Sequence, residues 1–227
     1  MKYYLNQRPP LSIFSEAFIF NKQSRTSFFI NIILTTIIMT EKIVEYLINL
    51  LNVKGAELQY GGEGVSQLEH ALQCADIAEQ YNGSKEMITS ALLHDIGHLL
   101  YEGKDPIDKG VDAKHEELAA DFLSQYLEPA ITMPIRAHVD CKRYLVTKKK
   151  KYYNSLSEAS KNSLVAQGGP FTIEEAGNFI KKPFMIEAIE LRKFDDLAKV
   201  KNKKTPPMGH FKLYIEKSFQ ANRIVGK

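Results

Sequence analysis

The chain has 227 residues, a formal net charge of +3 and two cysteines, which suits one domain, or one large domain with a tail. Its basic residues form no extended face interleaved with aromatic residues, so nucleic acid is not expected as a partner. Cys74 and Cys141 lie far apart and outside any CxxC pattern. This excludes a disulfide framework and favours a reducing compartment, the cytoplasm.

The first 38 residues differ from the rest of the chain. They contain one acidic residue, Glu16, and an apolar run over residues 28–39 that is too short to span a bilayer. No stable membrane insertion is therefore expected. The segment fits a transit-like or secretory leader, or an upstream extension ahead of a start at Met39. We accordingly divide the chain into an extension or leader, residues 1–38, and a domain, residues 39–227.

Apolar residues then recur at helical spacing. A first helix begins at Met39, and its apolar stripe consists of Ile43, Val44, Leu47, Ile48 and Leu51. A Gly-rich break covers residues 60–64. The next two helices are expected over residues 65–82 and 85–101, and Ser84 is the expected N-cap of the second of these.

The rest of the chain also reads as helices. A fourth helix follows Gly110, and Pro129 and Pro134 set off a fifth, which holds His138. Later helices are punctuated by Gly168-Gly169-Pro170, by the capping box that begins at Thr172, by Pro183 and by Pro206-Pro207. Alternating strand patterns and internal repeats are absent from the sequence. The predicted fold is all-α, a single helical bundle.

Five of the six histidines lie between positions 70 and 138. His94 and Asp95 stand inside an apolar run, where ionisable groups are costly unless they are paired or bind a metal. His98 follows at i+4, which places its imidazole on the same helix face as that of His94. A single histidine is more often an ordinary hydrogen-bonded residue, but the joint pattern favours a metal site. Imidazoles and carboxylates suit iron, manganese or zinc, and one carboxylate can join two ions.

Several motifs together resemble one family. They are the residues YGGEGVSQLEHALQCA from position 60, ALLHDIGH from position 91, HVDCKRYL from position 138, Ala159-Ser160 with the later QGGP, and LRKFD from position 191. In this combination they are similar to the HD-domain mixed-valence di-iron oxygenases that cleave phosphonates. The resemblance covers about residues 41–215 and implies an HD-domain helical bundle. Residues 1–38 have no counterpart in it.

The resemblance implies a role for each matching residue. His70, His94, Asp95 and Asp195 would hold one iron, and Asp95 would bridge to a second iron held by His115 and His138. The Arg-x-x-Asp spacing selects Asp195 over its neighbour Asp196. The phosphonate and the rest of the substrate would be held by His98, Lys142, Ser160, Gln167 and Arg192. Tyr60 would occupy the open iron position until substrate displaces it, and Glu63 would pair with the amino group of the substrate.

The implied reaction is cleavage of the C–P bond of a 1-hydroxy-2-aminoalkylphosphonate with O2 as co-substrate. For 2-amino-1-hydroxyethylphosphonate the products are glycine and phosphate, and the cofactors are two iron ions, Fe(II) and Fe(III). A primary amine is expected to be preferred over a trimethylammonium group, although Tyr60, Tyr101 and Tyr144 could line an aromatic cage. Two alternatives are a metal-dependent HD phosphohydrolase acting on a nucleotide or phosphomonoester, and a regulatory HD module without activity.

Overall fold

The structure is a computed structural model that describes residues 25–101 and 114–219. Within these ranges it has helices and no β-strand, so the prediction of an all-α fold is confirmed. The elements in chain order are α1 (Arg25–Leu50), the π-helical turn η2 (Leu51–Gly55), α2 (Gln67–Gln80), α3 (Lys85–Leu93), α4 (Gly97–Leu100), α5 (His115–Leu123), α6 (Pro129–Lys148), α7 (Tyr152–Ser155), α8 (Glu158–Ala166), α9 (Ile173–Phe179), α10 (Met185–Leu197) and α11 (Met208–Ser218).

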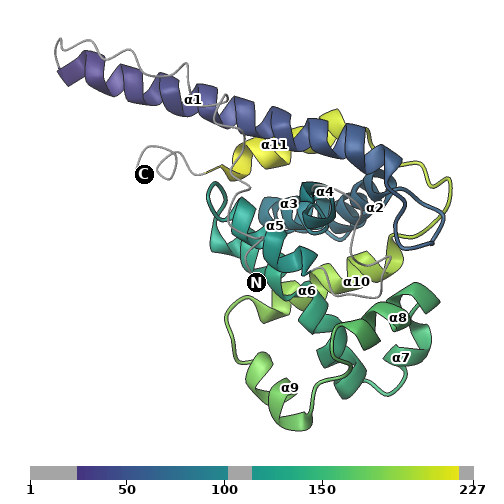
Figure 1. The fold of residues 1–227 in the computed structure, drawn as a ribbon. Coiled ribbons are helices and arrows are strands. Elements are labelled where there is room, and N and C mark those ends of the chain that lie inside the picture. The colour runs from purple at the N-terminus through teal and green to yellow at the C-terminus, as the bar shows by residue number, and fades with distance from the viewer. Residues whose placement is uncertain (1–24, 102–113, 220–227) are drawn as a thin grey trace.

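The helices stack in layers around α3 (Figure 1). α1 and α11 lie together on one side, α2 to α5 form the middle, and α6 and α10 pack against each other beneath them. Ile43, Val44 and Leu47, the expected stripe of the first helix, are fully buried in the main apolar core. A smaller apolar cluster joins α6, α9 and α10 on the far side. The main core therefore includes apolar residues of the central layer itself and joins this layer to α1 and α11 on one side and to α6 and α10 on the other.

Local hydrogen bonds explain where several helices begin. The Ser84 hydroxyl accepts from the Met87 N–H, as expected of an N-cap. Thr172 forms the predicted capping box at the start of α9, and Ser66 forms another at the start of α2. The cap at Ser66 matters for the site because it fixes the helix that carries His70.

Two predicted helix boundaries are wrong. α1 begins at Arg25 rather than Met39, because no glycine or proline interrupts residues 25–50. Pro134 does not separate two segments but lies inside α6, which begins at Pro129. A proline in the second turn removes one hydrogen bond, and the tertiary packing of α6 tolerates that loss.

A third boundary is wrong within the expected helix at residues 85–101. The helix stops at Leu93, and α4 begins only at Gly97. The break lies at His94, Asp95 and Ile96, so the His-Asp pair occupies a turn rather than the middle of a helix.

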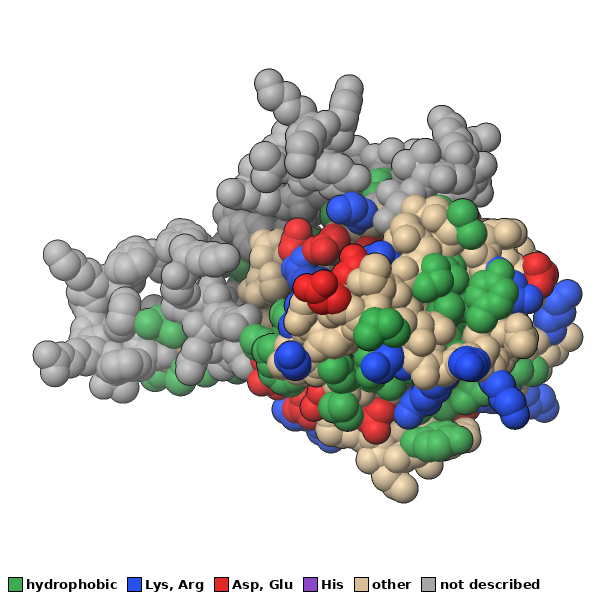
Figure 2. All heavy atoms as spheres, turned by 90° about the horizontal axis from the view of Figure 1, so that it is seen from below, with side chains coloured by type: hydrophobic (Ala, Val, Ile, Leu, Met, Phe, Trp, Pro, Cys, Tyr) green, Lys and Arg blue, Asp and Glu red, His purple; other side chains and the backbone are tan. Residues whose placement is uncertain are grey.

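The outer part of α1 is apolar and exposed. It projects beyond the body (Figure 1), and Ile33 and Leu34 are 57% and 50% exposed. Among the described residues, no helix combines the length and the hydrophobicity that crossing a bilayer requires. On the face seen in Figure 2, lysines and arginines are spread among hydrophobic and acidic side chains. The part of the predicted leader before residue 25 lies outside the described residues.

The boundary at residue 39 predicts the effect of a deletion. A chain shortened to begin at Met39 keeps the buried stripe of α1 and every candidate ligand. It should therefore fold and bind as much metal as the full chain. Circular dichroism melting and metal analysis of the two proteins check this. A chain from Met39 that does not fold would show that the first 38 residues belong to the domain.

Candidate metal centre and substrate pocket

The turn between α3 and α4 depends on Gly97. A Cβ atom at this position would lie 2.0 Å from the carbonyl oxygen of His115, so only glycine lets the start of α4 touch the start of α5. The imidazole of His98 then stacks on that of His115, with ring centroids 4.0 Å apart. His94 instead contacts His70 and, edge to face, His138. The two histidines of the motif therefore contact different partners.

The Asp95 carboxylate lies between two pairs of imidazoles. Its Oδ2 atom is 3.6 Å from Nε2 of His70 and 3.4 Å from Nε2 of His94. Its Oδ1 atom is 3.3 Å from Nε2 of His115 and 3.5 Å from Nε2 of His138. Within the pairs, the Nε2 atoms are 3.3 Å and 3.2 Å apart. Two atoms bound to one metal at about 2.1 Å are about 3.0–3.4 Å apart, so each group comes within about 0.2 Å of the spacing of a ligand set.

Backbone carbonyls orient three of these imidazoles. In each ring Nδ1 lies at hydrogen-bond distance from a carbonyl oxygen: His70 to Ala198 at 2.8 Å, His94 to Ala91 at 2.9 Å and His138 to Ile135 at 2.7 Å. The Nδ1 atom must carry the proton, since a carbonyl only accepts. In a neutral ring Nε2 is then an unprotonated acceptor directed at the centre, as in metal-binding histidines. In the fourth ring, His115, Nδ1 is 3.5 Å from Oε2 of Glu116.

The electrostatics of the buried cluster favour a cation. Burial lowers the pKa of His70 to about 4 and holds that of His138 well below its usual value. These rings are therefore neutral at pH 7. Burial alone would raise the pKa of Asp95, but the imidazoles of His94 and His115 outweigh it and hold the pKa well below the usual range. Lone pairs of imidazoles and a carboxylate thus face one another, an arrangement that a metal cation stabilises.

Asp195 completes the cluster. It extends from α10, and its Oδ1 atom is 3.5 Å from Nε2 of His70. A carboxylate oxygen of Asp195 also lies within 4.8 Å of a ring nitrogen of His94 and of His138. The neighbouring Asp196 instead pairs with Arg192 and with the hydroxyl of Tyr152. The structure therefore brings together all six predicted ligands and directs Asp196 elsewhere.

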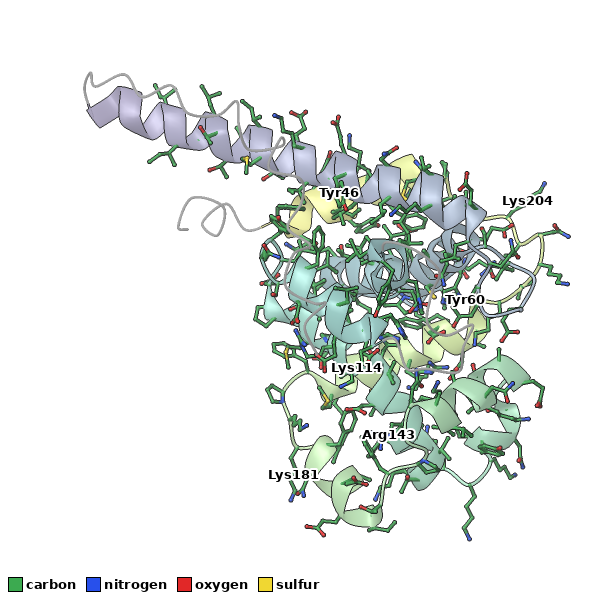
Figure 3. The ribbon with its side chains drawn as sticks, viewed as in Figure 1. Tyr46, Tyr60, Lys114, Arg143, Lys181 and Lys204 are labelled. Carbon is green, nitrogen blue, oxygen red and sulfur yellow. The ribbon has the colours of Figure 1, made fainter. Side chains whose placement is uncertain are left out.

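Tyr60 covers the cluster on the side of Asp195. Its hydroxyl donates to Oδ1 of Asp195 at 2.9 Å, and its ring stacks on His70 with centroids 3.8 Å apart. Figure 3 shows Tyr60 inside the body near α10, whereas Lys204 extends outward. Burial, followed by the charges of Asp195 and Asp95, raises the pKa of Tyr60 well above its usual value, so the phenol stays protonated. Tyr60 begins a tight loop in which Gly61, Gly62 and Gly64 all have positive φ.

A cavity of about 630 Å³ opens beside the cluster. Asp95, His115, His138 and Asp195 of the cluster line this cavity. Its walls include every residue predicted to contact substrate: Tyr60, Glu63, His98, Lys142, Ser160, Gln167 and Arg192. The pocket is therefore built jointly by α6, α8, α10, the turn before α4 and the loop that follows Tyr60.

Two cations stand in the walls of this pocket. Lys142 is buried, and its Nζ donates to Oγ of Ser163 at 2.6 Å. Burial, followed by the charge of Arg192, lowers the pKa of Lys142 to about 7. The Arg192 guanidinium lies 2.6 Å from Oδ2 of Asp195 and also pairs with Asp196. Arg192 thus holds a candidate metal ligand as well as facing the pocket.

Sequence reasoning did not single out several residues near the site. Ser163 bonds Lys142, and Lys199 reaches Ser160 with its ammonium group. Cys74 is buried, and its Sγ atom lies 3.6 Å from Nε2 of His70. Its i+4 spacing from His70 was the available signal.

The bridging position of Asp95 predicts unequal effects of two mutations. Asp95→Ala should reduce bound metal from about two ions per chain to almost none, because one carboxylate serves both ligand groups. His115→Ala should leave about one ion, since it belongs to one group only. Metal analysis of the purified variants measures this. Retention of two ions in Asp95→Ala would contradict the bridge.

The close approach at Gly97 predicts a packing defect. Gly97→Ala should lower the free energy of unfolding by about 1–3 kcal/mol and reduce bound metal, because the new Cβ displaces the backbone of His115. Gly177→Ala in α9 is the matched control, since a Cβ there meets no atom within 4 Å. Denaturant melts and metal analysis of both variants make the comparison. Equal effects at the two positions would overturn this role.

Comparisons with known proteins agree with this geometry. The HD domain family matches residues 68–159. The chain is 42% identical over 176 residues to a Leisingera caerulea protein named 1-hydroxy-2-(trimethylamino)ethylphosphonate dioxygenase (glycine-betaine-forming), covering 77% of this chain and 89% of that protein. It is 42% identical over 156 residues to the hydroxymethylphosphonate dioxygenase of Gimesia maris, covering 68% and 78%. An uncharacterized protein of Acanthamoeba polyphaga mimivirus is 37% identical over 177 residues, covering 76% and 80%.

These matches favour an oxygenase over a phosphohydrolase or a regulatory module without activity. The segment that matches the HD domain family includes His70, Asp95 and His138. The chain belongs to the HD-domain family of phosphonate-cleaving oxygenases and is a dioxygenase that uses a metal and O2.

Proposed function

We propose that the protein is a di-iron dioxygenase that cleaves the C–P bond of a 1-hydroxy-2-aminoalkylphosphonate, with 2-amino-1-hydroxyethylphosphonate as the simplest substrate and glycine and phosphate as products. The observation that carries the proposal is the composition of one cavity. Asp95, which lies between two pairs of imidazoles, lines this cavity. The other lining residues include two cations, Lys142 and Arg192, and two buried acceptor atoms without a partner among the described residues.

The donor set fits two irons. His70, His94, Asp95 and Asp195 would hold one ion, and His115, His138 and Asp95 the other, since nitrogen and oxygen donors without a required thiolate suit iron. When bound, the irons supply the redox chemistry with O2. The protein's own part is to position the substrate and to keep water away from it.

The phosphonate would be bound by Lys142, Arg192, His98 and Ser160, all of which line the cavity. Arginine offers paired N–H donors to the oxygens of an anion, and lysine adds a point charge. Lys142 and Arg192 are buried at 2% and 3% exposure, where a charge-assisted hydrogen bond is stronger than it would be in water. This end of the substrate is therefore fixed by charge.

The other end of the substrate would meet two acceptors. Oε1 of Glu63 and Oε1 of Gln167 are buried and have no hydrogen-bond partner among the described residues, and both residues line the cavity. A buried acceptor without a partner costs free energy that a donor on the ligand recovers. A primary ammonium brings three N–H donors, whereas a trimethylammonium group brings none. The pocket therefore favours the unsubstituted amine.

Among its described lining residues, the pocket also lacks the aromatic cage that a trimethylammonium group would need. Tyr60 is the one phenol ring among the described lining residues. Tyr144, expected to be able to line a cage, packs instead against Phe179 with centroids 5.5 Å apart. An aromatic cage for a quaternary ammonium needs several rings around one point. This supports the choice of a primary amine, although one relative is named for a trimethylamino substrate.

Kinetics with three phosphonates test the proposed substrate. The iron-loaded protein should turn over 2-amino-1-hydroxyethylphosphonate with a higher kcat/KM than its trimethylated analogue or hydroxymethylphosphonate, and turnover should stop without O2. Glu63→Ala should lower kcat/KM for the amine by about tenfold or more, the value of a charged hydrogen bond, with iron content unchanged. Faster turnover of the trimethylated substrate would contradict the proposal.

The lowered pKa of Lys142 predicts a pH dependence. Below about pH 7 the ammonium is charged and binds the phosphonate, and above it the amine is neutral. The kcat/KM, which reports the free enzyme, should therefore fall as pH rises above about 7. Lys142→Arg keeps its charge and should remove this fall. Ionisation of the phosphonate itself affects both proteins equally, so the Lys142→Arg variant also serves as the control for it. Identical pH profiles for the two proteins would exclude Lys142 as the titrating group.

A further inference from the structure

Lys199 stands on a segment that is tied to α2 on both sides. The carbonyl of Ala198 faces Nδ1 of His70 at 2.8 Å. The amide side chain of Gln73 pairs with both backbone groups of Val200, each at 3.0 Å. Gln73 is 1% exposed, so these two hydrogen bonds form away from water. The backbone of Lys199 is thus fixed relative to the metal centre.

The side chain of Lys199 points toward the site from behind the cavity wall. Its Nζ donates to Oγ of Ser160 at 2.9 Å and lies 4.0 Å from Oδ1 of Asp195. It also lies 5.4 Å from the centroid of the Tyr60 ring. Ser160, Asp195 and Tyr60 all line the cavity, and Lys199 does not. Lys199 therefore acts on the substrate only through another residue.

The chemistry of the contact fixes the direction of one hydrogen bond. An ammonium group only donates, so the Ser160 hydroxyl must accept from Lys199. The single hydrogen of the Ser160 hydroxyl then points away from Lys199, and this hydroxyl donates to no acceptor among the described residues. Without Lys199, a serine hydroxyl in a helix can rotate and donate to a carbonyl of the preceding turn. That rotation would turn the hydrogen away from the cavity.

We propose that Lys199 is a positioning residue that keeps the Ser160 hydroxyl as a donor toward a phosphonate oxygen. The inference rests on the proposed function, because it needs an anionic group in the cavity. It assigns no substrate contact to Lys199. It also predicts that the two residues act as one unit, so their mutational effects are not additive.

A double-mutant cycle tests this coupling. Lys199→Met, Ser160→Ala and the double variant are compared for KM and kcat with 2-amino-1-hydroxyethylphosphonate, for the Kd of inorganic phosphate, and for iron content. Each single variant should lose about tenfold in kcat/KM, mainly through KM, as expected for one hydrogen bond. The double variant should lose no more than Ser160→Ala alone. Lys199→Arg should stay within about threefold of the wild type because it still donates.

Lys193→Met is the matched control, because Lys193 is an exposed lysine on α10 and removing its charge should leave all these values unchanged. Multiplied losses in the double variant, about a hundredfold together, would overturn the coupling. Loss of iron in Lys199→Met would show that Lys199 acts through Asp195 instead. If Lys199→Met does not fold, Lys199→Gln replaces it in the same cycle.

The inference and the proposed function can fail separately. A wild-type protein that does not turn over the phosphonate contradicts the proposed function. In that case the Kd of inorganic phosphate, measured across the same double-mutant cycle, still shows whether Lys199 and Ser160 act together. Additive losses of phosphate affinity contradict the inference whichever substrate the enzyme uses.

Discussion

The position of the Asp95 carboxylate governs the rest of the site. Each of its oxygens faces a pair of imidazole nitrogens at 3.3–3.6 Å, and burial lowers the pKa of His70, His115 and His138, so these three rings are neutral at pH 7. Such a cluster is unfavourable in a buried core unless cations occupy it. Metal binding and folding of this centre are therefore coupled, and every helix that delivers a ligand must meet at this one carboxylate.

The fold meets this requirement by a turn between α3 and α4 and by hydrogen bonds that fix the segment after α10. The turn at Asp95 needs Gly97 to pass the backbone of His115. The end of α10 needs Gln73 to hold the segment whose Ala198 carbonyl orients His70. The same α10 supplies Asp195 and Arg192, and their ion pair connects the ligand set to the proposed anion site. The geometry of a substrate that binds both the metals and the cations therefore depends on how α6 and α10 pack against each other.

The sequence predicted the helical class and the caps at Ser84 and Thr172, because periodicity and capping are local signals. The histidine pattern predicted a metal site, and the resemblance to a family implied the full set of residues that meet there. The sequence did not predict the break at His94, because the reason for the break is the backbone of His115, which is distant in sequence. Lys199 was missed for the same reason: a lysine after a helix looks like a surface charge until α8 is placed beside it. The outer part of α1 was not predicted, because the unusual composition of residues 1–38 was taken to mark a separate extension. The absence of glycine and proline from residues 25–50 was the signal for a continuous helix.

The central claim is that one carboxylate joins two metals. Anomalous diffraction at the iron edge, from crystals of the iron-loaded wild-type protein, tests it most directly. The account predicts two peaks, one beside His70 and His94 and one beside His115 and His138, with the Asp95 carboxylate between them. A single peak, or two peaks on the same side of Asp95, would contradict it.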